Sequence, residues 1–227
     1  MRKIALETQY DTQVQAYAKG ITDYNKESRE LFFTLMPDLR EKTVLDLACG
    51  DGTDARTYAL LGAHVTGVDA SKEMVHTARQ LAPAVTFVEG KMEAVPLSEQ
   101  FDVITCKYAL QTSRDIKVVY EEMDRLLKPG GTLLLLVTHP LRQFLEKKGK
   151  TIDYFAKEIV RSHIFEGKIE LHEPSHTFNE YLSPYFLTTF DLQYYFEREE
   201  FPGAERIDGH NYPCYCIIKA IKRGEKQ

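Results

Sequence analysis

Short apolar runs alternate with amphipathic segments between about residue 43 and residue 137 of this 227-residue chain. The apolar runs have the length of strands buried on both faces, and the amphipathic segments are long enough for helices. This alternation predicts a parallel β-sheet covered by helices. The expected strands are 43–47, 64–68, 85–88, 102–106 and 132–137, and the expected helices are 53–61, one that Ser71 opens and Pro83 ends, and about 115–127.

The alternation of apolar runs and amphipathic segments ends after residue 138. Residues 139 to about 190 are too many for a simple connection and are rich in Tyr and Phe, so we expect a lid over a functional site. Within it, Thr177 to Glu180 has the form of a capping box that starts a helix, and Pro184 should kink or split that helix. Residues 190–197 alternate in polarity and residues 214–221 are apolar, which predicts a closing antiparallel pair.

These segments together predict an α/β fold of the Rossmann-like, doubly wound type. We expect a mostly parallel seven-stranded sheet with an antiparallel C-terminal strand, in one domain over residues 1–227. Its expected parts are an N-terminal helical cap (1–40), a ligand-binding core (41–138), a lid or substrate cap (139–190) and a C-terminal β-hairpin (190–222).

The Gly-rich turn after the first expected strand carries most of the functional information. Gly50, Gly52 and Ala55 fit the pattern G-x-G-x-x-G/A of dinucleotide-binding proteins, but such a fragment alone is weakly specific. Asp46, at the end of the strand, distinguishes between a dinucleotide and a cationic cofactor. Its carboxylate would repel a pyrophosphate and attract the sulfonium and α-amino group of S-adenosylmethionine (SAM).

A second acidic residue ends the second expected strand. Asp69 follows the Gly-rich turn by roughly 20 residues, where a carboxylate accepts hydrogen bonds from ribose hydroxyls. Enzymes that use NAD and enzymes that use SAM share this feature, so it indicates a nucleoside cofactor without choosing one. The structural alternative, in which Asp69 caps the next helix, competes with Ser71 for that position.

Residues 43 to 137 resemble the class I SAM-dependent methyltransferase superfamily, particularly small-molecule enzymes with the methyltransferase domain 11 pattern. The resemblance is carried by five segments in order: VLDLACGDGT at 44–53, GVDAS at 67–71, VEGKMEAVPL at 88–97, FDVITCKYALQ at 101–111 and LKPGG at 127–131. It implies SAM as cofactor, S-adenosyl-L-homocysteine (SAH) as product and methyl transfer to a nucleophilic N, O or C atom of a small molecule.

The resemblance also implies roles for individual residues. Asp46 with the backbone of Ala48, Gly50 and Gly52 would hold the methionine part of SAM, and Asp69 the ribose. The other residues expected to bind the cofactor are Ala70 and Met74 at the adenine, Lys91, Met92 and Glu93 after the third strand, Cys106 and Lys107 after the fourth, and Tyr17. Ala48 replaces a frequent Gly and Lys91 a common Asp, so the Met92 backbone is the better candidate at the adenine edge.

Four residues are candidates for catalysis. His139 follows the fifth strand and His176 precedes the lid helix, and either could act as a general base, although a structural role is equally consistent with each. Tyr24 and Tyr108 could close the pocket. The His and Cys spacings do not fit a metal site, so none is expected.

Composition narrows the class of protein further. A net charge of −5 argues against a broad nucleic-acid footprint, and the short apolar runs against a membrane span, so we expect a cytoplasmic protein with reduced cysteines. Edge strands near residues 190–221 could pair two chains into a homodimer. Two other functions stay open: a non-catalytic SAM-binding protein, and an NAD-dependent oxidoreductase.

Overall fold

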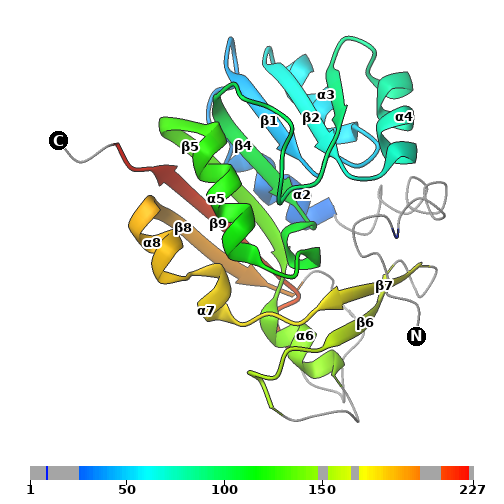
Figure 1. The fold of residues 1–227 in the computed structure, drawn as a ribbon, viewed down its shortest axis with the longest axis vertical. Helices are drawn as coiled ribbons and strands as arrows, with labels where there is room; N and C mark the ends of the chain where they lie inside the picture. Colours follow the sequence, from blue (N-terminus) through cyan, green and yellow to red (C-terminus); the bar gives the residue numbers. More distant parts are fainter. Residues whose placement is uncertain (1–8, 10–25, 148–152, 165–168, 200–210, 225–227) are drawn as a thin grey trace.

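The structure is a computed structural model that describes residues 9, 26–147, 153–164, 169–199 and 211–224. Its centre is a sheet of seven strands in the order β3-β2-β1-β4-β5-β9-β8 (Figure 1). The first five strands pair in parallel, whereas β9 pairs antiparallel with both β5 and β8. The strands are β1 (Thr43–Leu47), β2 (His64–Asp69), β3 (Thr86–Glu89), β4 (Phe101–Lys107), β5 (Leu127–Thr138), β8 (Phe190–Arg198) and β9 (Tyr215–Lys222).

Helices cover both faces of this sheet. On one face, Ala55, Tyr58 and Ala78 of α3 and α4 pack against β1–β4, and Phe32 of α2 packs against Leu134 of β5. The opposite face buries residues of α5, α7 and α8 against β4, β5 and β9. The helices are α2 (Lys26–Thr34), α3 (Thr53–Leu60), α4 (Lys72–Leu81), α5 (Ile116–Leu126), α7 (Phe178–Tyr181) and α8 (Pro184–Thr189). The predicted doubly wound α/β fold is confirmed.

Local sequence explains where several helices begin. The Ser71 hydroxyl accepts the Met74 N–H at 3.1 Å and so caps α4, as predicted. Thr177 and Glu180 form the predicted capping box of α7. Pro184 then occupies the first turn of α8, so the expected lid helix is split in two.

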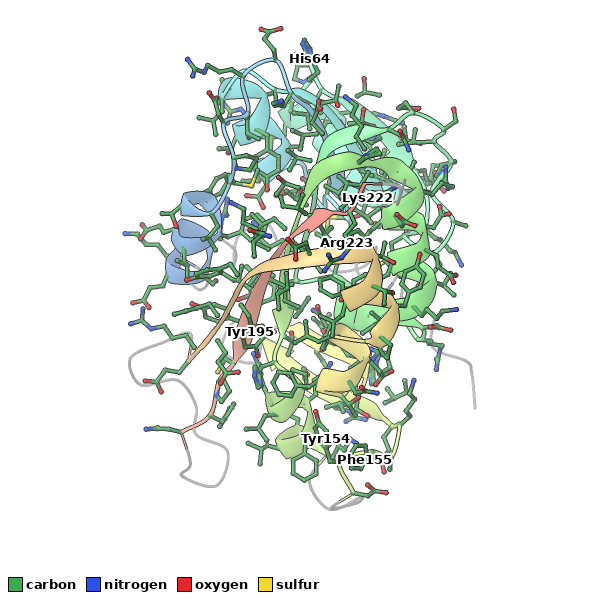
Figure 2. The ribbon with its side chains drawn as sticks, turned by 90° about the vertical axis from the view of Figure 1, so that its left-hand side faces the viewer. His64, Tyr154, Phe155, Tyr195, Lys222 and Arg223 are labelled. Carbon is green, nitrogen blue, oxygen red and sulfur yellow. The ribbon has the colours of Figure 1, made fainter. Side chains whose placement is uncertain are left out.

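The segment between β5 and α7 contains an element that the sequence analysis did not predict. After α6 (Pro140–Glu146), strands β6 (Ile159–Ile164) and β7 (Ile169–Pro174) form a separate two-stranded antiparallel sheet. Figure 2 shows Tyr154 and Phe155, from the segment before β6, at the opposite end of the molecule from His64, the first residue of β2. The residues before this hairpin therefore lie beyond the carboxyl ends of the parallel strands.

All four cysteines are free and buried. Among the described residues, no helix is both long and apolar enough to cross a membrane.

Candidate functional site

Two adjoining cavities open at the carboxyl ends of β1, β2 and β4. We call the first the apolar cleft, which measures about 640 Å³ with its open mouth, and the second the charged cavity, which measures about 480 Å³. Ala48, Gly50, Lys107 and Tyr108 line both, so the cavities form one continuous site. It lies where the strand order reverses between β1 and β4, the usual place for a ligand in an open α/β sheet.

The Gly-rich turn after β1 wraps one wall of this site. Ala48 and Gly50 both have a left-handed backbone, with φ of 59° and 54°. Gly50 donates its N–H to the Asp69 Oδ2 at 2.8 Å, and Gly52 donates its N–H to the Cys49 carbonyl at 3.1 Å. These two backbone donors are thus used inside the protein and do not point at a ligand.

Asp69 stands at the end of β2 and lines the apolar cleft. Its Oδ1 accepts the Ser71 N–H at 2.9 Å, while Oδ2 accepts the Gly50 N–H. A carboxylate oxygen can accept more than one hydrogen bond. Asp69 can therefore both hold the turn and accept hydrogen bonds from hydroxyls in the cleft.

Asp46 on β1 is the most deeply buried charged group of the site, with 4% of the residue exposed. The Thr105 hydroxyl on β4 donates to the Asp46 Oδ1 at 2.9 Å, whereas the Asp46 Oδ2 is buried and has no hydrogen-bond partner among the described residues. Burial raises the pKa of Asp46 to about 6, against the opposing effects of the Lys107 charge and the Thr105 hydroxyl. An unpaired buried carboxylate oxygen suits a ligand that brings a donor or a cation.

Three charged side chains from three elements meet across the charged cavity. Asp54, in the first turn of α3, forms ion pairs with Arg29 of α2 at 2.7 Å and with Lys107 at the end of β4. Burial lowers the pKa of Lys107 to about 7, helped by Arg29 and opposed by Asp46 and Asp51. The cavity thus has opposite charges at close range.

The apolar cleft has a different lining. Ala70 follows β2, Met74 faces it from the first turn of α4, and Met92 from the turn after β3. Of the expected ligand-binding residues, Lys91 and Glu93 lie there too, and Glu93 accepts a 2.6 Å hydrogen bond from the Ser113 hydroxyl. The small and sulfur-containing side chains of the apolar cleft suit the flat faces of an aromatic ring.

Tyr108 lines both cavities where they join. Its backbone is left-handed, with φ of 51°, a conformation that is costly for a bulky residue and that concentrates at functional sites. Its hydroxyl donates to the Ser28 hydroxyl at 3.1 Å, which ties α2 to the end of β4. Of the expected catalytic residues, Tyr108 is therefore the one that the described structure brings into the site.

Two expected ligand residues do not line either cavity. Gly52 packs inward, since a Cβ there would lie 2.9 Å from both the Ala78 Cβ and the Phe87 Cζ. The missing side chain allows the start of α3 to pack closely against α4 and β3. Cys106 is fully buried in the core beneath β4, because successive strand residues face opposite sides and Lys107 takes the site-facing position. Their roles in cofactor binding stay predictions, which the lining of the two cavities does not support.

The two histidines are also placed away from the site. His139 caps α6: its Nδ1 accepts the Leu141 N–H at 3.1 Å, so its proton is on Nε2, which lies 3.0 Å from the Glu197 Oε2. His176 is 2% exposed, and its Nε2 donates to the Gln111 carbonyl at 3.1 Å. Neither lines a described cavity, and both have structural partners. The role of either as a general base stays a prediction, which these contacts do not support.

The cavities also have lining residues that the sequence analysis did not name. Tyr17 and Tyr24 fall outside the described residues. Asp54 stands directly after the Gly-rich turn, so its position in the motif was a usable signal. Arg29 is far from every motif in the sequence, and only the packing of α2 brings it to Asp54. The unexpected lining residues are Arg29, Cys49, Asp51, Thr53, Asp54, Gly90, Ala109 and Thr112.

Comparisons with known proteins show similarity to methyltransferases. A family model described as a methyltransferase domain matches residues 44–131. Malonyl-[acyl-carrier protein] O-methyltransferase of Enterobacter lignolyticus is 33% identical over 112 residues, 49% of this chain and 45% of that protein. An uncharacterised methyltransferase of Synechocystis is 30% identical over 149 residues, 55% of this chain and 70% of that protein. The crystal structure of an S-adenosylmethionine-dependent methyltransferase from Mesorhizobium loti has a TM-score of 0.70 at 20% identity, covering 85% of this chain and 96% of that one.

The fold, the site and these relatives together define a class I methyltransferase. The chain belongs to the SAM-dependent methyltransferase superfamily, as its five motifs predicted. It spans about half the length of most of the curated relatives that it matches.

Proposed function

We propose that this chain binds SAM across the two cavities and transfers its methyl group to a nucleophilic N, O or C atom of a small molecule. The observation that carries the proposal is that the charged cavity, with its buried Asp46, adjoins the apolar cleft, which Asp69 and Met74 line. SAM has the same division, because a cationic sulfonium joins its amino acid to its adenosine.

The charges of the site favour this ligand over a dinucleotide. Asp46, Asp51 and Asp54 all face the charged cavity beside the Gly-rich turn. The N–H groups of Gly50 and Gly52, which would cradle a pyrophosphate in a dinucleotide site, are already bonded within the protein. An anionic pyrophosphate would meet three carboxylates, whereas a sulfonium and an ammonium are attracted by them.

The residues of the apolar cleft fit the adenosine end. Asp69 lines the cleft with a carboxylate, a group that accepts hydrogen bonds from ribose hydroxyls, and Ala70, Met74 and Met92 supply apolar surface for the base. Lys91 also lines the cleft, where its side chain can lie along the edge of the adenosine. These residues would hold the nucleoside while the charged cavity takes the amino acid.

SAM supplies an activated methyl group to an in-line displacement, and the chain's own task is to orient the two reactants. The sulfonium joins the two halves of SAM, so its expected place is where the two cavities meet, beside Lys107 and Tyr108. Tyr108 is therefore the residue we assign to contact the acceptor. Its left-handed backbone and its bond to Ser28 hold the ring at that junction.

A binding experiment tests the proposal directly. SAM, SAH and NADH are titrated by calorimetry into the wild-type chain and into Ala70→Trp, which fills the apolar cleft. We expect the wild type to bind SAM and SAH. The variant should bind both at least ~10-fold more weakly, because the steric conflict between the new indole ring and the ligand costs more than ~1.4 kcal/mol. Ala84→Trp, on an exposed loop outside both cavities, is the matched control and should bind as the wild type does. Binding of NADH with no response to either SAM species would refute the proposal.

A further inference from the structure

The hairpin of β6 and β7 packs on the protein through a face that is half polar. These two strands form a sheet of their own, and no third strand joins it in the part of the chain that the structure describes. Alternate residues of the hairpin are buried, namely Val160 and Ser162 on β6 and Leu171 and Glu173 on β7. A two-stranded sheet is at best marginally stable in water by itself, so the hairpin depends on the contacts of this face.

Glu173 bridges two amide side chains from different elements. Its Oε1 accepts a hydrogen bond from the Gln111 Nε2 at 3.3 Å, and its Oε2 accepts one from the Gln143 Nε2 at 3.4 Å. Burial raises the pKa of Glu173, which Glu146 raises further and which Arg142 and the two amides lower. An ionised carboxylate is therefore costly to bury here, and the two amide donors offset part of that cost.

The two amides belong to different parts of the fold. Gln143 of α6 also donates to the Pro174 carbonyl at 3.2 Å and accepts the His176 N–H at 3.1 Å, so it is tied to the end of β7. Gln111 belongs to η2 (Leu110–Thr112), the 3-10 helix that follows β4 in the core. The Gln111 backbone carbonyl also accepts the His176 Nε2–H at 3.1 Å. Gln111 therefore connects the core to the hairpin segment through both its side chain and its backbone.

The same short helix forms part of the wall of the apolar cleft. Ala109, directly before η2, and Thr112, its last residue, both line the cleft, and Gln111 lies between them in the chain. The Thr112 N–H and hydroxyl both donate to the Ala109 carbonyl at 2.8 Å, which closes this turn. A ligand that contacts Ala109 or Thr112 therefore restrains the turn that carries Gln111.

Desolvation opposes the docked position of the hairpin. Glu173 is 2% exposed, so its carboxylate has exchanged water for hydrogen bonds from neutral amides. The carboxylate orients the Gln111 Nε2 toward itself, which leaves the Gln111 Oε1 buried and without a hydrogen-bond partner among the described residues. Both groups would regain water if the hairpin moved away. These costs bring the docked and undocked positions closer in free energy, which allows a ligand to shift the balance between them.

We propose that the hydrogen bond between Gln111 and Glu173 couples the position of the β6–β7 hairpin to cofactor binding in the apolar cleft. Gln111 is a positioning residue: a ligand that restrains the turn from Ala109 to Thr112 restrains the Gln111 amide, and the amide holds Glu173 and the hairpin. The hairpin is thereby fixed in place when the methyl donor is bound. The inference rests on the proposed function, because it takes SAM or SAH as the ligand of the cleft.

Hydrogen exchange of backbone amides, followed by mass spectrometry on peptides from β6 and β7, tests the coupling. In the wild type, saturating SAH should slow exchange of the hairpin at least ~5-fold, the lower end of the usual coupling between two sites. Gln111→Glu places a second carboxylate against Glu173, so hairpin exchange without ligand should be at least ~10-fold faster than in the wild type. In this variant SAH should slow hairpin exchange by less than about twofold.

The double variant Gln111→Glu/Glu173→Gln exchanges the donor and the acceptor. Its new amide at position 173 can donate to the new carboxylate at position 111 and still accept from Gln143, so both hydrogen bonds return and the net charge is unchanged. Hairpin exchange in the double variant, with and without SAH, should return to within about threefold of the wild type. Gln100→Glu, the same substitution at an exposed residue directly before β4, is the matched control and should behave as the wild type does.

Peptides from β4 and β5 report the stability of the core in the same samples. If Gln111→Glu speeds exchange in the core as much as in the hairpin, Gln111 has only a structural role and the proposal is refuted. A wild type that binds SAH without slower hairpin exchange also refutes it, as does a double variant that exchanges as fast as Gln111→Glu. If calorimetry detects no binding of SAH to the wild type, the proposed function fails and the coupling fails with it.

Discussion

The ionisation of Asp46 can be perturbed through a single neighbouring hydroxyl. Thr105 lies opposite Asp46 on β4 and donates to its Oδ1 at 2.9 Å, while the second carboxylate oxygen has no partner in the described part of the chain. Thr105→Val preserves the shape of the side chain and removes this donor. The variant leaves a buried carboxylate whose ionised form has lost its one hydrogen bond from a side chain.

The size of the effect follows from the lost hydrogen bond. A hydrogen bond to a charged group contributes about 1.5–3 kcal/mol, part of which the neutral carboxyl also gains. Since 1.36 kcal/mol corresponds to one pKa unit, the pKa of Asp46 should rise from about 6 to about 7. The charges that face Asp46 from neighbouring elements, those of Lys107, Asp69 and Asp51, are unchanged by the substitution.

The expected pH dependence has a definite sign. Asp46 must be ionised to attract the cationic end of SAM or SAH, so affinity rises as the pH increases through the pKa of Asp46. In the wild type this rise falls near pH 6, and in Thr105→Val it should move up by about one unit. The variant therefore moves the acid limb of the binding profile to higher pH.

The same shift has a consequence for stability. The folded-state pKa of Asp46 is raised above the 3.8 that is usual for an exposed aspartate, so its ionisation costs stability. That cost is absent below about pH 4 and complete above about pH 6 in the wild type. Thr105→Val should thus be destabilised by about 1.5–3 kcal/mol at pH 8 and by less at pH 5.

The assay is calorimetric titration of SAH at half-unit steps from pH 5 to 8, combined with urea unfolding at pH 5 and pH 8. Thr86→Val, the same substitution at an exposed position of β3, is the control and should leave both profiles unchanged. If the acid limb of the Thr105→Val binding profile coincides with that of the wild type, Thr105 does not set the ionisation of Asp46 and the reasoning fails.

Two further predictions concern residues that support the structure around the site. Gly67→Ala should lower the free energy of unfolding by about 1–3 kcal/mol, because the new Cβ would lie 2.6 Å from the Phe87 Cδ1. Urea unfolding measures it, and Gly224→Ala, with open space around it, should change stability by less than about 0.5 kcal/mol. His139→Asn should retain SAH affinity within about threefold and lose about 1 kcal/mol of stability with its Glu197 contact, since Asn also caps helices. A large loss of SAH affinity at unchanged stability would show that His139 belongs to the site after all.

Much of the binding half of the site could be predicted because its residues are close in the chain. Asp46 and Gly50 belong to one strand-and-turn unit, and Asp69 ends the strand that pairs beside it. Strand, turn and helix start are each specified by residue types in a short window, such as Ser71 at the start of α4. The order of these units along the chain then places their carboxyl ends together.

The catalytic candidates show where such reasoning stops. His139 and His176 stand next to the right elements in sequence, yet their ring nitrogens are bonded to Leu141 and to the Gln111 carbonyl. Whether a histidine faces a cavity or a packed neighbour depends on residues far away in the chain. No local pattern distinguishes the two cases.

The sequence by itself determined the class of fold, the strands of the parallel core and the acidic residues at the ends of β1 and β2. These depend on hydrophobic period and turn chemistry, which contiguous residues encode. The tertiary structure alone decided that Arg29 meets Asp54 and Lys107, and that Cys106 and Gly52 turn inward. Such contacts join segments from separate elements, and their geometry exists only after the helices have packed on the sheet and excluded water from the charges between them.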